Sequence, residues 1–138
     1  MEHFAAPDGR RLAYRVDGEG NPTILCLAGL SRNSRDFDGL AQHLAPRVRV
    51  VRLDSRGRGS SDWAEEPMAE YTIPTEAGDV IALIEHLDLG SVVIAGTSRG
   101  GILGMALANA RPELLRGLIL NDIGAMVEGG GLLRILAT

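Results

Sequence analysis

Four short apolar runs, separated by stretches with helical spacing, limit most strongly what this 138-residue chain can fold into. Residues 23–28 are almost continuously apolar and end at Gly29, which is typical of a strand buried on both faces of a sheet. Comparable runs cover residues 48–53, 91–96 and 115–121, and a shorter strand is expected over residues 12–16. Helical spacing is found over residues 34–44, 77–87 and 99–110. Strands that alternate with helices indicate an α/β fold with a mostly parallel sheet and flanking helices.

The charge balance and the lack of long apolar runs exclude two classes of partner. The chain has a net charge of −4, so it lacks the basic surface that a nucleic acid requires. No apolar run approaches the roughly 20 residues of a membrane span, and the N-terminus lacks the pattern of a secretory signal. The single cysteine, Cys26, lies in an apolar run and is interpreted as a buried hydrophobic residue rather than a nucleophile. We therefore expect a cytoplasmic protein without nucleic-acid or membrane partners.

The segment from Gly96 to Gly100 has the pattern Gly-x-Ser-x-Gly, with Ser98 at its centre. The pattern is informative here because it follows an expected buried strand and opens an expected helix. Such a tight turn needs glycines where side chains would collide across it, and it exposes the serine hydroxyl above the carboxyl end of the sheet. It also leaves the amide of Arg99 free at a helix N-terminus, where an oxyanion would form. We interpret Ser98 as a nucleophile and Arg99 as an oxyanion donor.

Two glycine-containing loops follow other strands of the expected sheet. The amide of Leu30, directly after Gly29, is a candidate for a second oxyanion donor, and an ordinary glycine turn is the alternative. Residues 54–62 carry glycines at alternate positions, which lets a loop fold tightly over the end of the sheet. Asp54 and Arg56 can pair to brace that loop, so we interpret it as scaffolding rather than as part of the catalytic machinery.

Taken together, four segments resemble the α/β-hydrolase superfamily, in particular its small serine esterases, lactonases and C–C bond hydrolases. They are residues 25–30, 54–62, 96–101 and 118–124, in that family's order and at its usual spacing. The resemblance implies Ser98 as the nucleophile and the amides of Arg99 and Leu30 as the oxyanion hole. The family usually has a histidine before the glycine of the first segment, where this chain has Ala28. A backbone donor survives that change.

The resemblance also implies parts of a hydrolase that these residues do not include. In the family the catalytic acid and histidine usually follow later strands, in a chain about twice as long. We expect residues 1–122 to be the N-terminal part of an α/β-hydrolase core truncated before its last strands, and residues 123–138 to begin a cap domain. A minority of the family places its acid after the strand that ends near Asp122. Asp122 is therefore a candidate acid, although a polar residue at the base of the cap is the favoured interpretation.

A serine hydroxyl needs a base within hydrogen-bonding reach to be nucleophilic at neutral pH. The sequence has three histidines, His3, His43 and His86, and each is predicted to lie on the surface away from Ser98. We expect little or no turnover from the 138 residues alone. The parent enzyme would hydrolyse a small acyl substrate (an ester, thioester, lactone or activated ketone) through an acyl-enzyme, without a cofactor or a metal ion.

Two other functions compete with this one. A catalytically inactive, truncated binding module or remnant is favoured by the lack of a suitably placed histidine. A dinucleotide-binding domain is disfavoured because the segment 96–101 lacks the spacing Gly-x-Gly-x-x-Gly. Because the expected hydrolase core is truncated before its last strands, its last strand would expose an unpaired edge, and the isolated chain is expected to self-associate through it.

Overall fold

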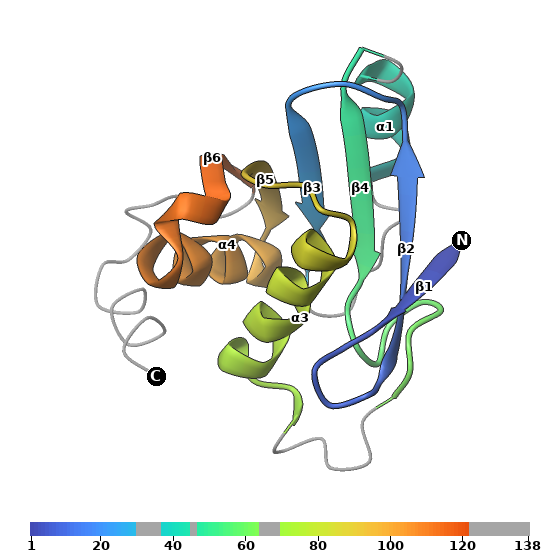
Figure 1. The fold of residues 1–138 in the computed structure, drawn as a ribbon, viewed down its shortest axis with the longest axis vertical. Helices are drawn as coiled ribbons and strands as arrows, with labels where there is room; N and C mark the ends of the chain where they lie inside the picture. The colour runs from blue at the N-terminus through green and yellow to red at the C-terminus, as the bar shows by residue number, and fades with distance from the viewer. Residues whose placement is uncertain (30–36, 45–46, 64–69, 122–138) are drawn as a thin grey trace.

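The computed structural model describes residues 1–29, 37–44, 47–63 and 70–121 (Figure 1). The strands are β1 (Glu2–Ala5), β2 (Arg11–Asp17), β3 (Thr23–Leu27), β4 (Arg49–Asp54), β5 (Val92–Thr97) and β6 (Leu115–Asn121). The helices are α1 (Asp38–Leu44), α3 (Ile73–His86) and α4 (Arg99–Ala110), and η2 (Pro112–Leu114) is a short 3-10 helix. Strands and helices alternate from β3 onward, as the apolar runs predict.

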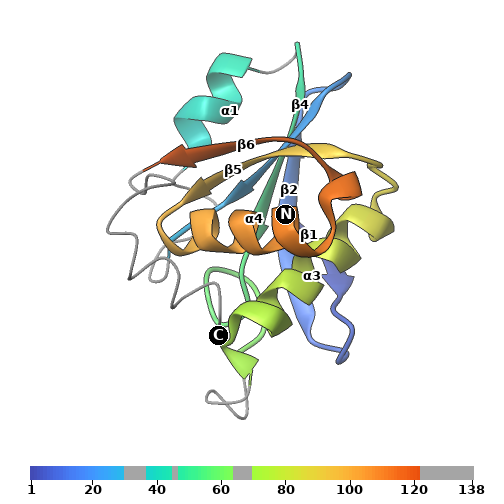
Figure 2. The same ribbon diagram turned by 90° about the vertical axis from the view of Figure 1, so that its left-hand side faces the viewer.

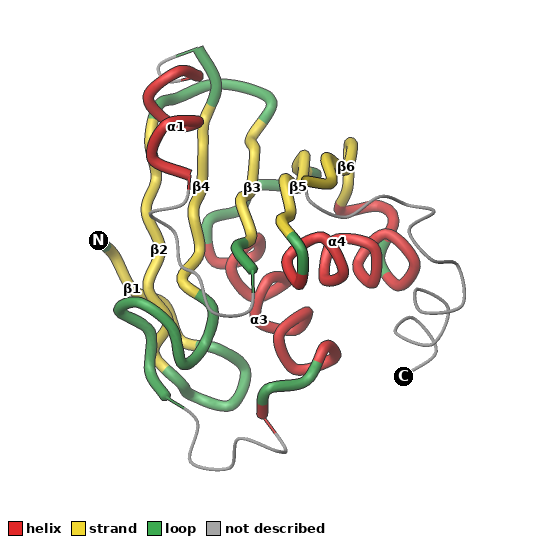
Figure 3. The backbone as a smooth tube through the Cα atoms, turned by 180° about the vertical axis from the view of Figure 1, so that it is seen from behind, coloured by secondary structure: helices red, strands yellow, loops and turns green. Residues whose placement is uncertain are grey.

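Within these ranges the strands form one sheet in the order β1-β2-β4-β3-β5-β6, which Figure 3 shows from behind. Strands β4, β3, β5 and β6 are parallel to one another, whereas β2 is antiparallel to both of its neighbours. The predicted α/β fold with a mostly parallel sheet is therefore confirmed. Because the carboxyl ends of the four parallel strands lie at one edge, the loops that follow them gather there.

The two faces of the sheet are covered by different helices (Figure 2). Leu25 and Leu27 of β3 pack with residues of α3 and α4, whereas Cys26 between them packs on the other face with Ala41 of α1. This split follows from the two-residue repeat of a strand, which points successive side chains to opposite faces. Because both faces are covered, β3 is apolar at nearly every position. Helices α3 and α4 lie on the same face of the sheet.

Helix α3 has well-defined ends, which fix where its polar residues lie. The hydroxyl of Thr72 accepts a hydrogen bond from the Thr75 amide (3.2 Å), and Pro74 occupies the first turn, where its missing N–H is not needed. Beyond the helix, Asp88 and Gly90 have φ values of 52° and 67°, which turn the chain toward β5. The first turn of α3 lies beside the start of α4, where Glu76 contacts Arg99, and the chain beyond α3 reaches the amino end of β4, where Leu87 and Leu89 lie near Arg49.

The sequence pattern did not predict β1. This strand has four residues, of which only Phe4 is buried, so it offers too short a pattern to be recognised. It forms by pairing with β2, whose own strand was predicted. No helix among the described residues is both long and apolar enough to cross a membrane.

Candidate active site

Ser98 lies on the turn between β5, which ends at Thr97, and α4, which begins at Arg99. Figure 1 shows these two elements. Its backbone has φ 53° and ψ −114°, a region that residues with a Cβ atom rarely occupy. The residue is nevertheless exposed. Strained backbone of this kind persists only where the surrounding structure enforces it, and it is concentrated at functional sites.

The two glycines of the motif make the turn sterically possible. A methyl group on Gly96 would overlap the backbone of Gly100, and a methyl group on Gly100 would overlap the carbonyl of Leu27. The turn is therefore folded against itself and against the end of β3. Glycine is the only residue that allows both approaches.

Backbone hydrogen bonds hold Ser98 between the sheet and the helix. Its amide donates to the carbonyl oxygen of Asn121, at the end of β6 (3.2 Å), and its carbonyl accepts from the Ile102 amide in α4 (3.1 Å). The next amides, those of Arg99 and Gly100, belong to the first turn of α4 and have no partner within the helix. Amides at a helix N-terminus stabilise a negatively charged oxygen that binds there.

The structure describes two of the four predicted site residues, Ser98 and Arg99. Leu30 and Asp122 lie outside the described residues, but their neighbours are within them. Gly29 is buried just beyond the end of β3, the strand whose Leu27 touches the serine turn. Asn121 pairs with Thr97 in the register of β5 and β6. Both predicted positions therefore follow strands that flank the strand leading to Ser98.

A buried carboxylate, which sequence reasoning missed, contacts the residue after the serine. Glu76 of α3 is 2% exposed. Its Oε2 accepts from the Nε (3.2 Å) and the Nη2 of Arg99, and its Oε1 accepts from the Nη1 of Arg58 (2.7 Å). In the sequence Glu76 is an acidic residue in the first turn of a helix, where acidic residues are common. The residues around Glu76 in the sequence do not indicate a special role for it, because its two partners come from other segments of the chain.

The loop after β4 is held by a second group of charges, centred on Arg56. This side chain is almost fully buried and binds Asp79 of α3 with two hydrogen bonds (2.7 and 2.6 Å) and Asp8 with another at 2.7 Å. The predicted partner Asp54 instead accepts from the Ser60 amide (3.0 Å). The scaffolding role predicted for the loop is consistent with these contacts, but its bracing is long-range rather than local.

These contacts shift the ionisation of the groups involved. The hydrogen bonds to Asp79 raise the pKa of Arg56 above its ordinary value, so the guanidinium remains charged. The hydrogen bond from Arg56 lowers the pKa of Asp8, whereas burial raises the pKa of Asp79 against the opposing effect of Arg56. The cluster depends on Arg56 to keep its carboxylates ionised.

All three histidines lie within the described residues, and none is near Ser98. His43 lies in the last turn of α1, the helix that leads into the amino end of β4, and His86 is the last residue of α3. The ring of His86 packs against those of Phe4 and Tyr14. His3 is in β1, four strands from β5, or about 19 Å at about 4.8 Å per strand.

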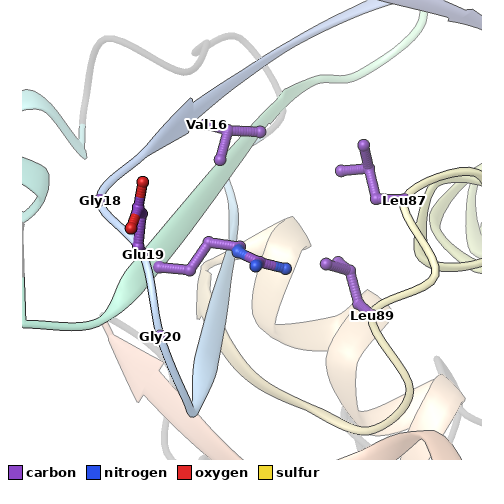
Figure 4. A pocket seen from close by; sticks show the side chains of 7 residues that line it. Val16, Gly18, Glu19, Gly20, Leu87 and Leu89 are labelled. Carbon is purple, nitrogen blue, oxygen red and sulfur yellow. The ribbon is translucent and has the colours of Figure 1, made fainter.

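A cavity of about 450 Å³ lies at the opposite end of the sheet from Ser98. Figure 4 shows the side chains that line it. It is lined by the turn after β2, by Arg49 at the start of β4, and by Leu87 and Leu89 beyond α3. Since these segments surround the amino ends of the parallel strands, the cavity is not part of the serine site. The described residues also include no group of three or more His, Cys, Asp or Glu side chains suited to hold a metal ion.

Comparison with known proteins agrees with the observed fold. The family model described as "alpha/beta hydrolase fold" matches residues 22–131. A 3-hydroxybutyrate-oligomer hydrolase from Cupriavidus necator is 39% identical over 127 residues, which are 91% of this chain and 43% of that protein. The lipase LipV from Mycobacterium tuberculosis is 33% identical over 83% of this chain and 42% of its own length.

A solved structure has the same fold. The crystal structure of an α/β hydrolase from Novosphingobium aromaticivorans superimposes with a TM-score of 0.85 at 42% identity, and the match covers 97% of this chain and 47% of that one. The chain thus spans less than half the length of each of these relatives.

Proposed function

We propose that Ser98 is the nucleophile of a serine hydrolase, since the chain belongs to the α/β-hydrolase family. The observation that carries the proposal is the exposed serine with a positive φ between β5 and α4. A turn of this shape is the setting in which a serine hydroxyl acts as a nucleophile in this fold. A serine at this position disfavours the related reactions that need a carboxylate nucleophile.

The proposed reaction is acyl transfer in two stages. The Oγ of Ser98 attacks the substrate carbonyl carbon and loses its proton to a base, and the negative charge collects on the carbonyl oxygen. The amides of Arg99 and Leu30 donate to that oxygen. Collapse of the tetrahedral intermediate breaks the bond to the leaving group, which takes up the proton. Water then hydrolyses the acyl-enzyme and restores Ser98.

The base is proposed to lie outside these 138 residues. None of the three histidines is placed to take the proton of Ser98. His3 lies in β1 and His86 packs against β1 and β2, whereas His43 is in α1, on the other face of the sheet from α4. We therefore expect the 138-residue chain by itself to turn over activated esters slowly, by virtue of the oxyanion donors alone.

The substrate class is proposed to be a small ester, thioester, lactone or activated ketone. Of the relatives described above, one is a hydrolase of 3-hydroxybutyrate oligomers and the other is a lipase. Both descriptions point to the hydrolysis of carboxylic esters. An oligoester of 3-hydroxybutyrate is accordingly the first natural type of substrate to try.

The experiment compares wild type with Ser98→Ala, both expressed from the native gene. Hydrolysis of p-nitrophenyl butyrate and of a 3-hydroxybutyrate dimer is followed at neutral pH. Wild type is expected to turn over at least one of them, and Ser98→Ala to lose the rate by a factor of about 10³ or more. A variant that retains most of the wild-type rate would overturn the assignment.

A catalytically inactive binding module is the second candidate, favoured by the position of the three histidines. It predicts no hydrolysis by the native gene product and no difference between wild type and Ser98→Ala. The same assay therefore separates the two functions.

A further inference from the structure

The carboxylate of Glu76 connects three segments that are far apart in sequence. It belongs to α3, it accepts from Arg58 in the loop after β4, and it accepts from Arg99 at the start of α4. Both of its oxygens are used, one by each arginine. We refer to these three side chains as the Glu76 clamp.

The clamp is strongly enclosed. Glu76 is 2% exposed, and the side chains of Arg58 and Arg99 are 12% and 21% exposed. Arg99 also donates to the backbone carbonyl of Tyr71 (3.4 Å), and the guanidinium of Arg58 lies 5.5 Å from the centre of the Tyr71 ring. Charges removed from water keep a fixed geometry only when they are well paired, so these contacts hold Arg99 from the α3 side.

The position of Arg99 next to the serine links its side chain to the proposed oxyanion hole. It follows Ser98 directly, and its amide is the proposed oxyanion donor. The amide and the side chain share one Cα atom, so a contact that fixes the guanidinium against α3 also limits how the amide can move. The other charged cluster, around Arg56, contacts α3 at Asp79 and has no bond to the serine turn among the described residues.

We propose that Glu76 is a positioning residue for the oxyanion hole, an inference that rests on the proposed serine hydrolase function. By pulling the side chain of Arg99 toward α3, it keeps the Arg99 amide aimed at the substrate oxygen. Arg58 neutralises the carboxylate a second time and ties the loop after β4 to the same point. Loss of Glu76 should therefore slow the chemical step rather than weaken substrate binding.

The test compares Glu76→Ala and Glu76→Gln in the native gene product, with kcat and KM measured at matched folded fractions. Displacement of a catalytic group by about 1 Å costs on the order of a hundredfold in rate. We expect kcat for Glu76→Ala to fall about ten- to a hundredfold with KM changed less than about threefold. Glu76→Gln, which keeps one carbonyl acceptor, should recover part of that loss.

Asp79→Asn is the matched control. Asp79 lies three residues further along α3, is equally buried, and pairs with a different arginine. Its substitution should lower the thermal midpoint and leave kcat per folded molecule within about twofold of wild type. Equal losses of kcat in the Glu76 and Asp79 variants would overturn the proposal, because they would reflect general loosening of α3.

A double-mutant cycle covers the case in which Glu76→Ala does not fold. Arg99→Met keeps the amide and removes the guanidinium, so Arg99→Met and Glu76→Gln should each reduce kcat, and the double variant should reduce it little further. Additive losses would contradict the clamp. Failure of the proposed function is recognised separately, since it would appear as full activity in Ser98→Ala or as no hydrolysis by wild type.

Discussion

Gly100 shows how tightly single residues determine the serine turn. The site at which a Cβ atom would be attached faces the backbone carbonyl of Leu27, which cannot move without shifting β3. We predict that Gly100→Ala lowers the free energy of unfolding by about 1 to 3 kcal/mol, as overpacking of a rigid site does. Chemical denaturation monitored by circular dichroism measures this change.

Gly78→Ala is the control for that substitution. Gly78 lies in α3, has open space where its Cβ atom would be, and has ordinary helical backbone. Its replacement should leave stability unchanged or raise it by up to about 1 kcal/mol, because alanine favours helix more than glycine does. If both variants had the same stability, the close contact at Gly100 would not be a constraint on the fold.

Cys26 provides a second residue-scale prediction. Burial in β3 raises the pKa of its thiol to about 12, so at pH 8 only about one thiol in ten thousand is ionised. Reaction of the native protein with a disulfide reagent such as Ellman's reagent should be far slower than reaction of the unfolded protein at the same pH. Rapid modification of the native protein at pH 8 would contradict the placement of Cys26 inside the sheet.

At the scale of elements, Arg56 joins the loop after β4 to α3. Replacement by methionine would keep most of the apolar stem and leave Asp79 buried without its partner. We predict that Arg56→Met destabilises the protein by about 3 to 5 kcal/mol, the usual cost of breaking a buried pair from one side. The midpoint and slope of urea denaturation test this value.

The exposed pair of Arg111 and Glu113 serves as the comparison for Arg56. These two residues lie near each other in sequence, between α4 and β6, and pair at the surface. Arg111→Met should leave the midpoint of unfolding nearly unchanged, since exposed ion pairs contribute little. A similar loss in both variants would mean that burial around Arg56 is not the reason for its importance.

The elements differ in how well the sequence alone predicts them. Strand β3 and helix α4 were predictable because each carries its own signal, a continuous apolar run in one case and helical spacing in the other. Strand β1 was not, since it depends on pairing with β2 and buries only Phe4. Local pattern predicts an element only when the element does not depend on a distant partner.

The same distinction applies to the site. The turn around Ser98 could be predicted because glycine, serine and glycine lie within five residues. The contacts of Glu76 with Arg99 and of Arg56 with Asp79 each join residues 23 positions apart, and no local sequence pattern predicts them. The roles of Leu30 and Asp122 remain predictions, since both residues lie outside the described ranges.

At the scale of the whole molecule, β6 is the feature that most affects behaviour in solution. Among the described residues it pairs with β5 alone, and Ile119 on it is 53% exposed. An open strand edge of this kind favours pairing with another chain. We predict that the 138-residue chain self-associates in sedimentation velocity runs, and that Ile119→Lys reduces the association. A monodisperse monomer across the micromolar range would contradict this prediction.

The nucleophilic role of Ser98 underlies the proposed function, and covalent labelling measures it without a choice of substrate. The protein expressed from its native gene is treated with a fluorophosphonate and mapped by peptide mass spectrometry, with Ser98→Ala treated in parallel. We expect one phosphonyl adduct, on the peptide that contains Ser98, and none in the variant. An adduct on a different residue, or equal labelling of Ser98→Ala, would contradict the assignment of Ser98 as the nucleophile.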